Sequence, residues 1–251
     1  MKTIAVIAQK GGTAKSTSVA CLGAGLHHEG LKVLHVDLDP QASLSLMLNA
    51  AAGKTIFDAL AKGTPIADTI QTTAQGALIA ADSRLVEKGL LTNAGEETRL
   101  KTALKPLQKR FDVALLDCAP NLGPLTVNAI AAADGLIIPL KADLLSLSAM
   151  HELNTTITIA KKRQNPKLKV YGIIITQYNG RASAPRLMLE EITAQAEKLG
   201  LPVYQPPIRR TVALEEIQIT HKSIFDTPKN PAAQDYKVIV EQLLNQLKKG
   251  A

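Results

Sequence analysis

Two lysines flank a pair of glycines close to the start of the chain, between an apolar segment and a segment of helical character. Residues 4–8 are apolar, and residues 10–16 read KGGTAKS. A strand that leads through a glycine loop into a helix presents unpaired backbone N–H groups to an anion, and the first helical turn adds partial positive charge. Lys15 and Ser16 suit contact with phosphates and Mg²⁺. The sequence therefore predicts a nucleotide polyphosphate site.

The general P-loop pattern has glycine at two positions where this chain has Gln9 and Ala14. What remains, KGGxxKS with a lysine at each end, resembles the deviant Walker A box of the ParA/MinD ATPase family, KGGxGK followed by serine or threonine. Glycine is used where backbone approaches a ligand closely. We therefore expect the Ala14 methyl group to crowd the phosphate or perturb the loop dihedrals, which would slow or retune the site. The expected nucleotide contacts are Lys10, Gly11, Gly12, Thr13, Ala14, Lys15, Ser16 and Thr17.

Three aspartates follow two further apolar strands. Residues 31–36 lead to Asp37 and Asp39 in the string DLDPQ, and residues 111–116 lead to Asp117. Carboxylates at the carboxyl ends of core strands lie at the ligand crevice of a parallel sheet, although such acids also serve as turn formers or loop caps. Asp117 can reach Mg²⁺ through water, as a Walker B acid does.

The resemblance extends to these strings. ParA-like proteins carry their second nucleotide motif where DLDPQ stands, which implies that Asp39 orients or activates the attacking water and that Asp37 lies near the magnesium shell. The string DCAPNLG is similar to the family's DCPPSLG, with Ala119 for proline and Asn121 for serine. By this resemblance the catalytic residues are Lys10, Lys15 and Asp39, and the metal site is formed by Ser16, Asp37 and Asp117.

The resemblance also implies where the nucleotide base and DNA bind. The adenine pocket is expected at Gln177 and, after a strand around Val203, at Pro207. Arg181 aligns with an arginine that ParA-like proteins use for sequence-independent DNA contact. A second such position falls at Ala213, and the arginines nearby are Arg209 and Arg210. For each of the three arginines, the alternative is an ordinary solvated side chain.

The balance of charge differs between the two halves of the chain. Residues 1–140 hold 13 basic and 12 acidic side chains, whereas residues 141–251 hold 16 and 10. A polyanion such as the DNA backbone would explain this surplus, and so would a solvated basic surface. Aromatic residues make up only 3% of the chain and tryptophan is absent, which argues against single-strand binding by base stacking.

The length of 251 residues suits one sizeable α/β domain and is short for two. We expect a single-domain P-loop NTPase fold over residues 1–251, a mostly parallel central sheet flanked by helices on both faces, without an N-terminal helix-turn-helix domain. The two cysteines and five histidines lack the spacing of a disulfide framework or a metal site. With neither a signal peptide nor a membrane-spanning apolar run, the protein is expected to be cytoplasmic.

Periodicity and turn residues predict the remaining elements. Strands are expected at 77–80, 135–139 and 168–176, and helices at 14–28, 43–48, 55–61, 96–110, 144–161 and 231–248. The last helix has an apolar stripe at helical spacing, but Asp235 and Glu241 interrupt any basic face. Core packing is therefore expected of it, rather than membrane anchoring.

The first hypothesis is a DNA-segregation ATPase for a plasmid or chromosome, with ATP and Mg²⁺ as cofactors. The resemblance implies a homodimer formed on ATP binding, in which Lys10 reaches the partner's phosphates. It also implies non-specific binding to double-stranded DNA in the nucleoid, and a ParB-like centromere-binding protein that stimulates hydrolysis and release. The alternatives are a MinD-like membrane-associated positioning ATPase, an iron–sulfur reductase component, for which Cys21 is misplaced within the first helix, and a P-loop relic without turnover.

Overall fold

A mostly parallel sheet forms the centre of the molecule. The computed structural model describes residues 1–87, 89–93, 95–120 and 123–249, and within these ranges seven strands pair in the order β3-β4-β2-β5-β1-β6-β7. Every neighbouring pair is parallel except β3 with β4. The strands are β1 (Lys2–Val6), β2 (Val33–Leu38), β3 (Ile70–Thr73), β4 (Gly76–Ile79), β5 (Val113–Cys118), β6 (Gly135–Lys141) and β7 (Lys169–Thr176). The predicted α/β fold class is confirmed.

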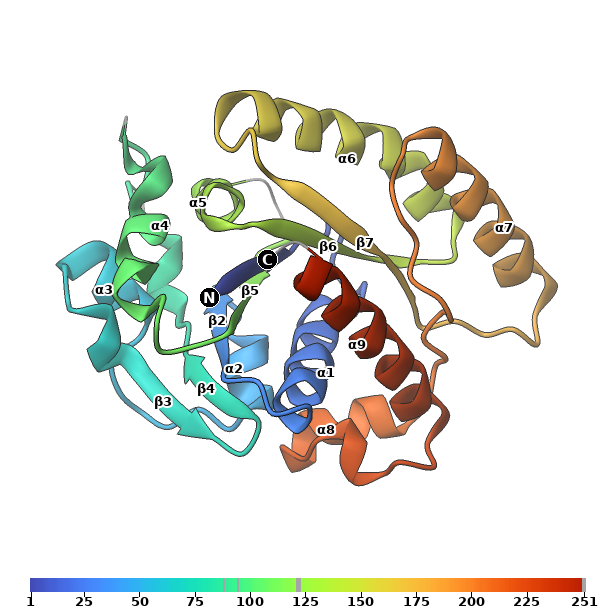
Figure 1. Cartoon of the computed structure of the whole chain (residues 1–251), viewed down its shortest axis with the longest axis horizontal. Helices are drawn as coiled ribbons and strands as arrows, with labels where there is room; N and C mark the ends of the chain where they lie inside the picture. The colour runs from blue at the N-terminus through green and yellow to red at the C-terminus, as the bar shows by residue number, and fades with distance from the viewer. Residues whose placement is uncertain (88, 94, 121–122, 250–251) are drawn as a thin grey trace.

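Helices cover both faces of this sheet (Figure 1). One apolar core lies under α1 (Lys15–His28), α2 (Ser43–Met47), α8 (Ala213–Thr220) and α9 (Pro231–Lys249). A second lies under α3 (Ile56–Lys62), α4 (Arg99–Leu104), α5 (Pro124–Ala132), α6 (Leu144–Arg163) and α7 (Ser183–Lys198). Strands buried on both faces explain why their sequences are continuous apolar runs rather than alternating ones.

The C-terminal helix α9 packs in the core, as its apolar stripe predicted. Tyr236, Ile239 and Leu243 are fully buried beside α1, and the Tyr236 hydroxyl lies 3.1 Å from the Ser18 hydroxyl. The apolar face of this helix is therefore occupied by the protein itself. None of the helices within the described ranges is both long enough and apolar enough to span a membrane.

The register of the central strands brings two of the predicted acids together. Val6 at the end of β1 is the register partner of Asp117 on β5, and Asp117 is in turn the partner of Asp37 on β2. Because parallel strands all end at the same edge of the sheet, the loop after β1 and both carboxylates are brought to one place. We call this the nucleotide edge, and the opposite edge, where the parallel strands begin, the basal edge.

Some predicted elements differ in the structure. The expected helix 96–110 is divided into a 3₁₀ turn, α4 and a second 3₁₀ turn, Lys105–Leu107, because Pro106 cannot donate a helical hydrogen bond and its ring crowds the preceding turn. The strand expected around Val203 consists of an isolated bridge to Ile173, since the prolines that follow lack an N–H. Strand β3 and helices α5, α7 and α8 lie in segments for which no element was predicted.

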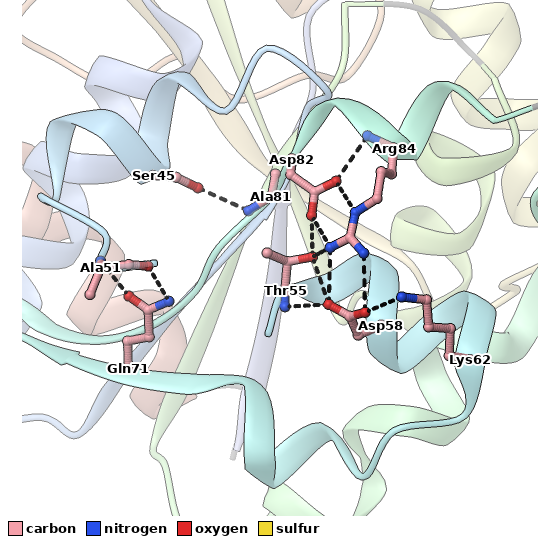
Figure 2. Close-up of polar contacts among 9 residues, drawn as sticks. All are labelled: Ser45, Ala51, Thr55, Asp58, Lys62, Gln71, Ala81, Asp82 and Arg84. Carbon is pink, nitrogen blue, oxygen red and sulfur yellow. Dashed lines mark hydrogen bonds and ion pairs between the residues drawn. The ribbon is translucent and has the colours of Figure 1, made fainter. Parts of the chain in front are cut away.

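A charged cluster holds α3 against the segment that follows β4 (Figure 2). Arg84 donates to Asp82 and Asp58 and lies 4.6 Å from the centre of the Phe57 ring. The Thr55 backbone N–H caps Asp58 at 3.0 Å, and this bond is the largest cause that lowers the pKa of the Asp58 carboxyl well below its usual range. The start of α3 and the segment after β4 are thereby connected by the ion pairs of Arg84 with Asp58 and Asp82.

Candidate functional site

A pocket of about 450 Å³ lies at the nucleotide edge, a size typical of small-molecule sites. All of residues 10–17 line it, together with Asp39 and Gln177. The structure thus brings the loop after β1, the end of β2 and the end of β7 to one cavity.

The loop at 10–14 adopts a conformation suited to glycine. Gly12 has φ of 73°, and Ala14, the residue before α1, has φ of 57° and ψ of 34°, in the left-handed region. Residues with a Cβ pay for this conformation, whereas glycine does not. The replacement of the expected glycine by Ala14 therefore strains the backbone at the start of α1, whose first N–H groups face the pocket.

Strand β7 holds the loop in place from the side. The Thr176 hydroxyl donates to the Thr13 carbonyl at 3.0 Å, and the Gln177 side-chain amide donates to the Gly12 carbonyl at 2.9 Å. These bonds occupy loop carbonyls, which leaves the backbone N–H groups as the polar atoms available to an anion. Gln177 therefore has an observed contact with the loop, in addition to its predicted place beside the base.

Lys15 lies buried between two acids. Its ammonium is 2.5 Å from Asp117 Oδ1 and 3.7 Å from Asp39 Oδ2. Burial alone would lower the pKa of Lys15, but the Asp117 carboxylate outweighs burial and raises it. The lysine is thus held charged at the bottom of the pocket, where a phosphate oxygen would find a cation with little competing water.

Asp37 is the most enclosed of the three acids. One of its oxygens accepts the Asp39 N–H, and the other accepts both the backbone N–H and the hydroxyl of Ser45. Burial, with the Asp117 carboxylate as the second cause, raises the pKa of Asp37 to about 7. This carboxyl therefore lies beneath the pocket, where it fixes Asp39 and the start of α2.

The residues present fit a magnesium ion. Asp117 Oδ2 is buried without a hydrogen-bond partner among the described residues, so one carboxylate oxygen is available for a hydrated cation. Ser16, at the first turn of α1, lies in the pocket wall above it. Mg²⁺ is commonly held by one or two carboxylates together with substrate phosphates. No cluster of three acidic, histidine or cysteine side chains suited to a metal is found in the described ranges. Asn121 of the second motif lies outside the described residues.

Lys10 contacts its own subunit. Its ammonium donates to the Leu145 carbonyl in the first turn of α6 at 2.9 Å, and its half-buried side chain also lines the pocket. To reach another subunit's phosphates, as predicted, this lysine has to leave one neutral acceptor. The cost of that exchange is about one ordinary hydrogen bond.

The predicted DNA-contacting arginines have different surroundings. Arg209 is committed to the protein, because its guanidinium donates to Asp235 through two nitrogens at 2.9 and 2.7 Å and to the Pro231 carbonyl at 3.1 Å. Arg210 lies 3.6 Å from Glu215 in an exposed pair. Arg181 is exposed and lines a second cavity of about 840 Å³ beside the first.

Some residues of the pocket wall left no signal in the sequence. Pro207, which was expected beside the base, is not among the described residues that line the pocket. Thr211 and the first turns of α8 line the pocket instead. The Thr211 hydroxyl is buried without a hydrogen-bond partner among the described residues. Lys141, at the end of β6, approaches the loop, since a Cβ on Gly12 would lie 3.7 Å from its ammonium.

The first strand of this parallel sheet leads through a phosphate-type loop to a buried lysine, and acids lie at the ends of β5 and β2. This arrangement defines a P-loop nucleotide-binding protein. Comparison with known proteins narrows this class. A family model described as an AAA domain matches residues 1–170. The chromosome-partitioning ATPase Soj of Thermus thermophilus is 33% identical over 246 residues, which cover 97% of this chain and 96% of that protein.

Solved structures agree with this assignment. A Mycobacterium smegmatis protein named cobyrinic acid a,c-diamide synthase, solved with ADP and magnesium, superposes with a TM-score of 0.87 at 34% identity, covering 100% of this chain and 97% of that one. The septum site-determining protein MinD of Pyrococcus horikoshii, at 23% identity, shares the fold with a TM-score of 0.79 and covers 96% and 95%. The chain belongs to the ParA/MinD family of ATPases, and the predicted cofactors, ATP and Mg²⁺, agree with the ligands of these solved relatives.

Proposed function

We propose that this chain is a Mg²⁺-dependent ATPase that partitions DNA, with slow turnover until a partner stimulates it. The observation that carries the proposal is the convergence of residues 10–17 and Asp39 on one pocket, in which Lys15 is paired with both Asp39 and the buried Asp117. The name of the Thermus relative, a chromosome-partitioning ATPase, supports the biological role. The proposal assigns residues 1–251 to one ATPase domain that acts in the cytoplasm on nucleoid DNA.

In this proposal the protein positions the reactants and compensates charge. Lys15 and the loop N–H groups hold the phosphates, while Ser16 and Asp117 hold Mg²⁺, which neutralises charge on the transferred phosphoryl group. Asp39, 7% exposed at the pocket wall, orients the attacking water. Asp37 supports Asp39 from below through its backbone N–H.

A homodimer formed on ATP binding is also part of the proposal, with Lys10 directed toward the partner's phosphates. Large apolar side chains are exposed close to the pocket: Leu145 at 62%, Val212 at 67% and Ile219 at 80%. Leu145 accepts the bond from Lys10, and the other two lie on or next to α8. Exposed apolar groups around a site commonly mark a protein interface, and a second copy would cover them.

Three variants test this function. Asp39→Ala is expected to bind ATP, form the dimer and remain on DNA without turnover. Lys10→Ala is expected to bind nucleotide but not to dimerise, because the lysine that would reach the partner's phosphates is gone. The monomer should stay folded, since Lys10 makes only one replaceable bond there. Lys15→Ala is expected to lose nucleotide binding. Removing the Lys15 ammonium leaves Asp117 buried and unpaired, which should destabilise the fold by about 3–5 kcal/mol. Nucleotide binding by this variant must therefore be measured together with its thermal unfolding.

The measurements are ATP turnover, nucleotide binding by fluorescence and mass in solution by light scattering, each with and without a ParB-like partner. Turnover by Asp39→Ala at the wild-type rate would show that Asp39 does not position the water. ATP-dependent flotation with vesicles, without retardation of DNA, would favour a MinD-like positioning role over DNA partitioning.

A further inference from the structure

The basal edge carries two strongly basic segments that the nucleotide site does not use. Residues 101–110 and 161–169 contain nine lysines and arginines and no acid. The whole chain carries a net charge of +7, so the remaining residues together carry −2. Eight of the nine side chains are exposed, and the ninth, Lys161, is half-buried. We call the two segments together the basal surface.

The fold joins these segments into one surface. Residues 101–110 lead into β5 and residues 161–169 into β7, and because β5 and β7 point the same way, both segments lie where strands begin. The turn between α5 and β6 connects them. Lys105 and Asp134 line one small cavity, and from the other side the Asn165 amide donates to the Ile130 and Ala133 carbonyls. Figure 1 shows α4, α5 and α6 in this order over one face of the sheet.

The charges of the basal surface are not neutralised within the chain. None of the nine cations pairs with a carboxylate of the described residues. The two acids next to them are engaged elsewhere, since Asp112 accepts the Lys32 N–H at 2.8 Å and Asp134 accepts the Thr3 N–H at 2.7 Å. These acids offset two of the nine charges and leave a clear positive surplus.

The predicted arginine site is weaker by the same measure. Arg209 is paired with Asp235, and Arg210 faces Glu215. Of the three arginines, only Arg181 has no acidic partner among the described residues. A phosphate backbone approaching that region would meet about as many acids as bases, whereas at the basal surface the nine cations outnumber the two neighbouring acids, Asp112 and Asp134.

The size and chemistry of the basal surface fit duplex DNA. Neighbouring helices pack 8–10 Å apart, so α4 and α6, with α5 between them, are roughly 20 Å apart. That span corresponds to about six base pairs at 3.4 Å each. Neither segment has an exposed large apolar side chain, which a membrane-binding surface would need. Phe111, the nearest aromatic, is covered by Arg110 at 5.8 Å and offers no stacking platform.

We propose that the basal surface is where this chain contacts the phosphate backbone of double-stranded DNA. The inference rests on the proposed function and moves its DNA contact from Arg181, Arg209 and Arg210 to the opposite edge. A five-residue strand separates the two edges by about 17 Å, so nucleotide does not touch the DNA surface directly.

The test compares matched charge-neutralised variants of the full chain. The basal variant is Lys162→Gln/Arg163→Gln/Lys167→Gln, and a second one is Lys105→Gln/Lys109→Gln/Arg110→Gln. The matched control, Lys222→Gln/Lys229→Gln/Lys237→Gln, removes three exposed lysines from the segment around α8 and α9. A fourth variant, Arg181→Gln/Arg210→Gln, tests the arginine site. Each is measured with a DNA duplex of mixed sequence in ATP, in ADP and across a salt series.

Each basal variant is expected to reduce the salt slope of DNA binding by about 2–3, and to weaken affinity at about 0.1 M salt by a factor on the order of 10². The control and the arginine variant are expected to stay within about threefold of wild type. Thermal unfolding and ATP turnover without DNA should be unchanged in the basal variants, because the substituted side chains are exposed and remote from the pocket.

Three results would overturn the inference. The first is wild-type DNA affinity in both basal variants. The second is a loss confined to the arginine variant or the control. The third is that basal substitution abolishes binding to vesicles of anionic phospholipid and leaves DNA binding intact. If the wild-type chain binds no DNA in any nucleotide state, the DNA role in the proposed function fails with it; if wild type binds and the basal variants bind equally, only the inference fails.

Discussion

Replacing Ala14 by glycine should stabilise the protein, although the same substitution in the interior of a helix destabilises the helix. Ala14 has φ of 57° and ψ of 34° and accepts the Ser18 N–H at 2.8 Å, so its conformation is fixed by the first turn of α1. A non-glycine residue in this left-handed conformation costs roughly 1–2 kcal/mol. Glycine removes that cost while it keeps the carbonyl in place.

The gain is partly offset in the unfolded chain. Glycine has more unfolded conformations than alanine, which costs about 0.4–1 kcal/mol. Taking the middle of each range, the net stabilisation from Ala14→Gly is therefore expected to be about 0.8 kcal/mol. For a protein of this size, 1 kcal/mol corresponds to a change in Tm of about 2–4 °C, so a rise of roughly 1–4 °C is expected. The loss of the methyl group should leave the affinity for nucleotide equal to that of the wild type or raise it.

Two matched alanines make the result interpretable. Ala42 precedes α2 with φ of 52° and ψ of 32°, so Ala42→Gly should be stabilising to a similar degree. Ala194 is exposed within α7, where glycine should cost about 1 kcal/mol. The three variants are compared by thermal unfolding and by ADP binding. A fall in Tm for Ala14→Gly like that for Ala194→Gly would refute the strain argument.

Three further predictions concern buried polar side chains. Ser45→Ala removes the hydroxyl that donates to Asp37. The same hydroxyl accepts the buried Ala81 N–H, as Figure 2 shows. Urea unfolding should therefore show a loss of about 2–3 kcal/mol, and a loss below about 0.5 kcal/mol would contradict this. Thr176→Val removes the donor to the Thr13 carbonyl, so ADP should bind several-fold more weakly, and Thr176→Ser should restore affinity if the hydroxyl is what positions the loop. Burial lowers the pKa of His35 to about 4, below the ordinary value of about 6.5. Its contribution to stability is therefore complete above pH 6.5 and is lost as the pH falls toward 4, by up to about 3 kcal/mol. In His35→Asn the free energy of unfolding should change less steeply between these pH values, and an equal slope would show that His35 is not the group responsible.

The loop and the acids of the nucleotide edge could be predicted because each of them leaves a local signal. Asp37 and Asp117 each end an apolar run, and such runs become central strands of a parallel sheet whose ends coincide. Lys15 follows a glycine loop that begins after the first strand. These inferences need only the order of strands and loops, and not the packing between distant segments.

What could not be predicted depends on side chains that meet across the fold. Arg209 reads as an exposed basic residue in sequence, but Asp235 on α9 lies opposite and holds it. Thr211 enters the pocket wall only because the segment after Tyr204 runs beside β7. Pro106 was present in the sequence, yet the apolar periodicity around it favoured one long helix. Such partners are fixed by tertiary packing, which overrides local pattern.

Charge balance links the four buried groups of the site. Lys15 supplies one positive charge, whereas Asp39 and Asp117 are acids within 4 Å of it, and Asp37, with a pKa of about 7, is partly protonated at neutral pH. Three acids therefore face one buried cation, and this excess of acidic groups is costly in a buried place. If Lys15 turns to a phosphate, Asp117 loses its counter-charge, and its unpaired Oδ2 becomes the natural place for a cation. The two acids that hold the lysine, with Asp37 beneath them, thus explain why polyphosphate and a divalent ion should enter this site together.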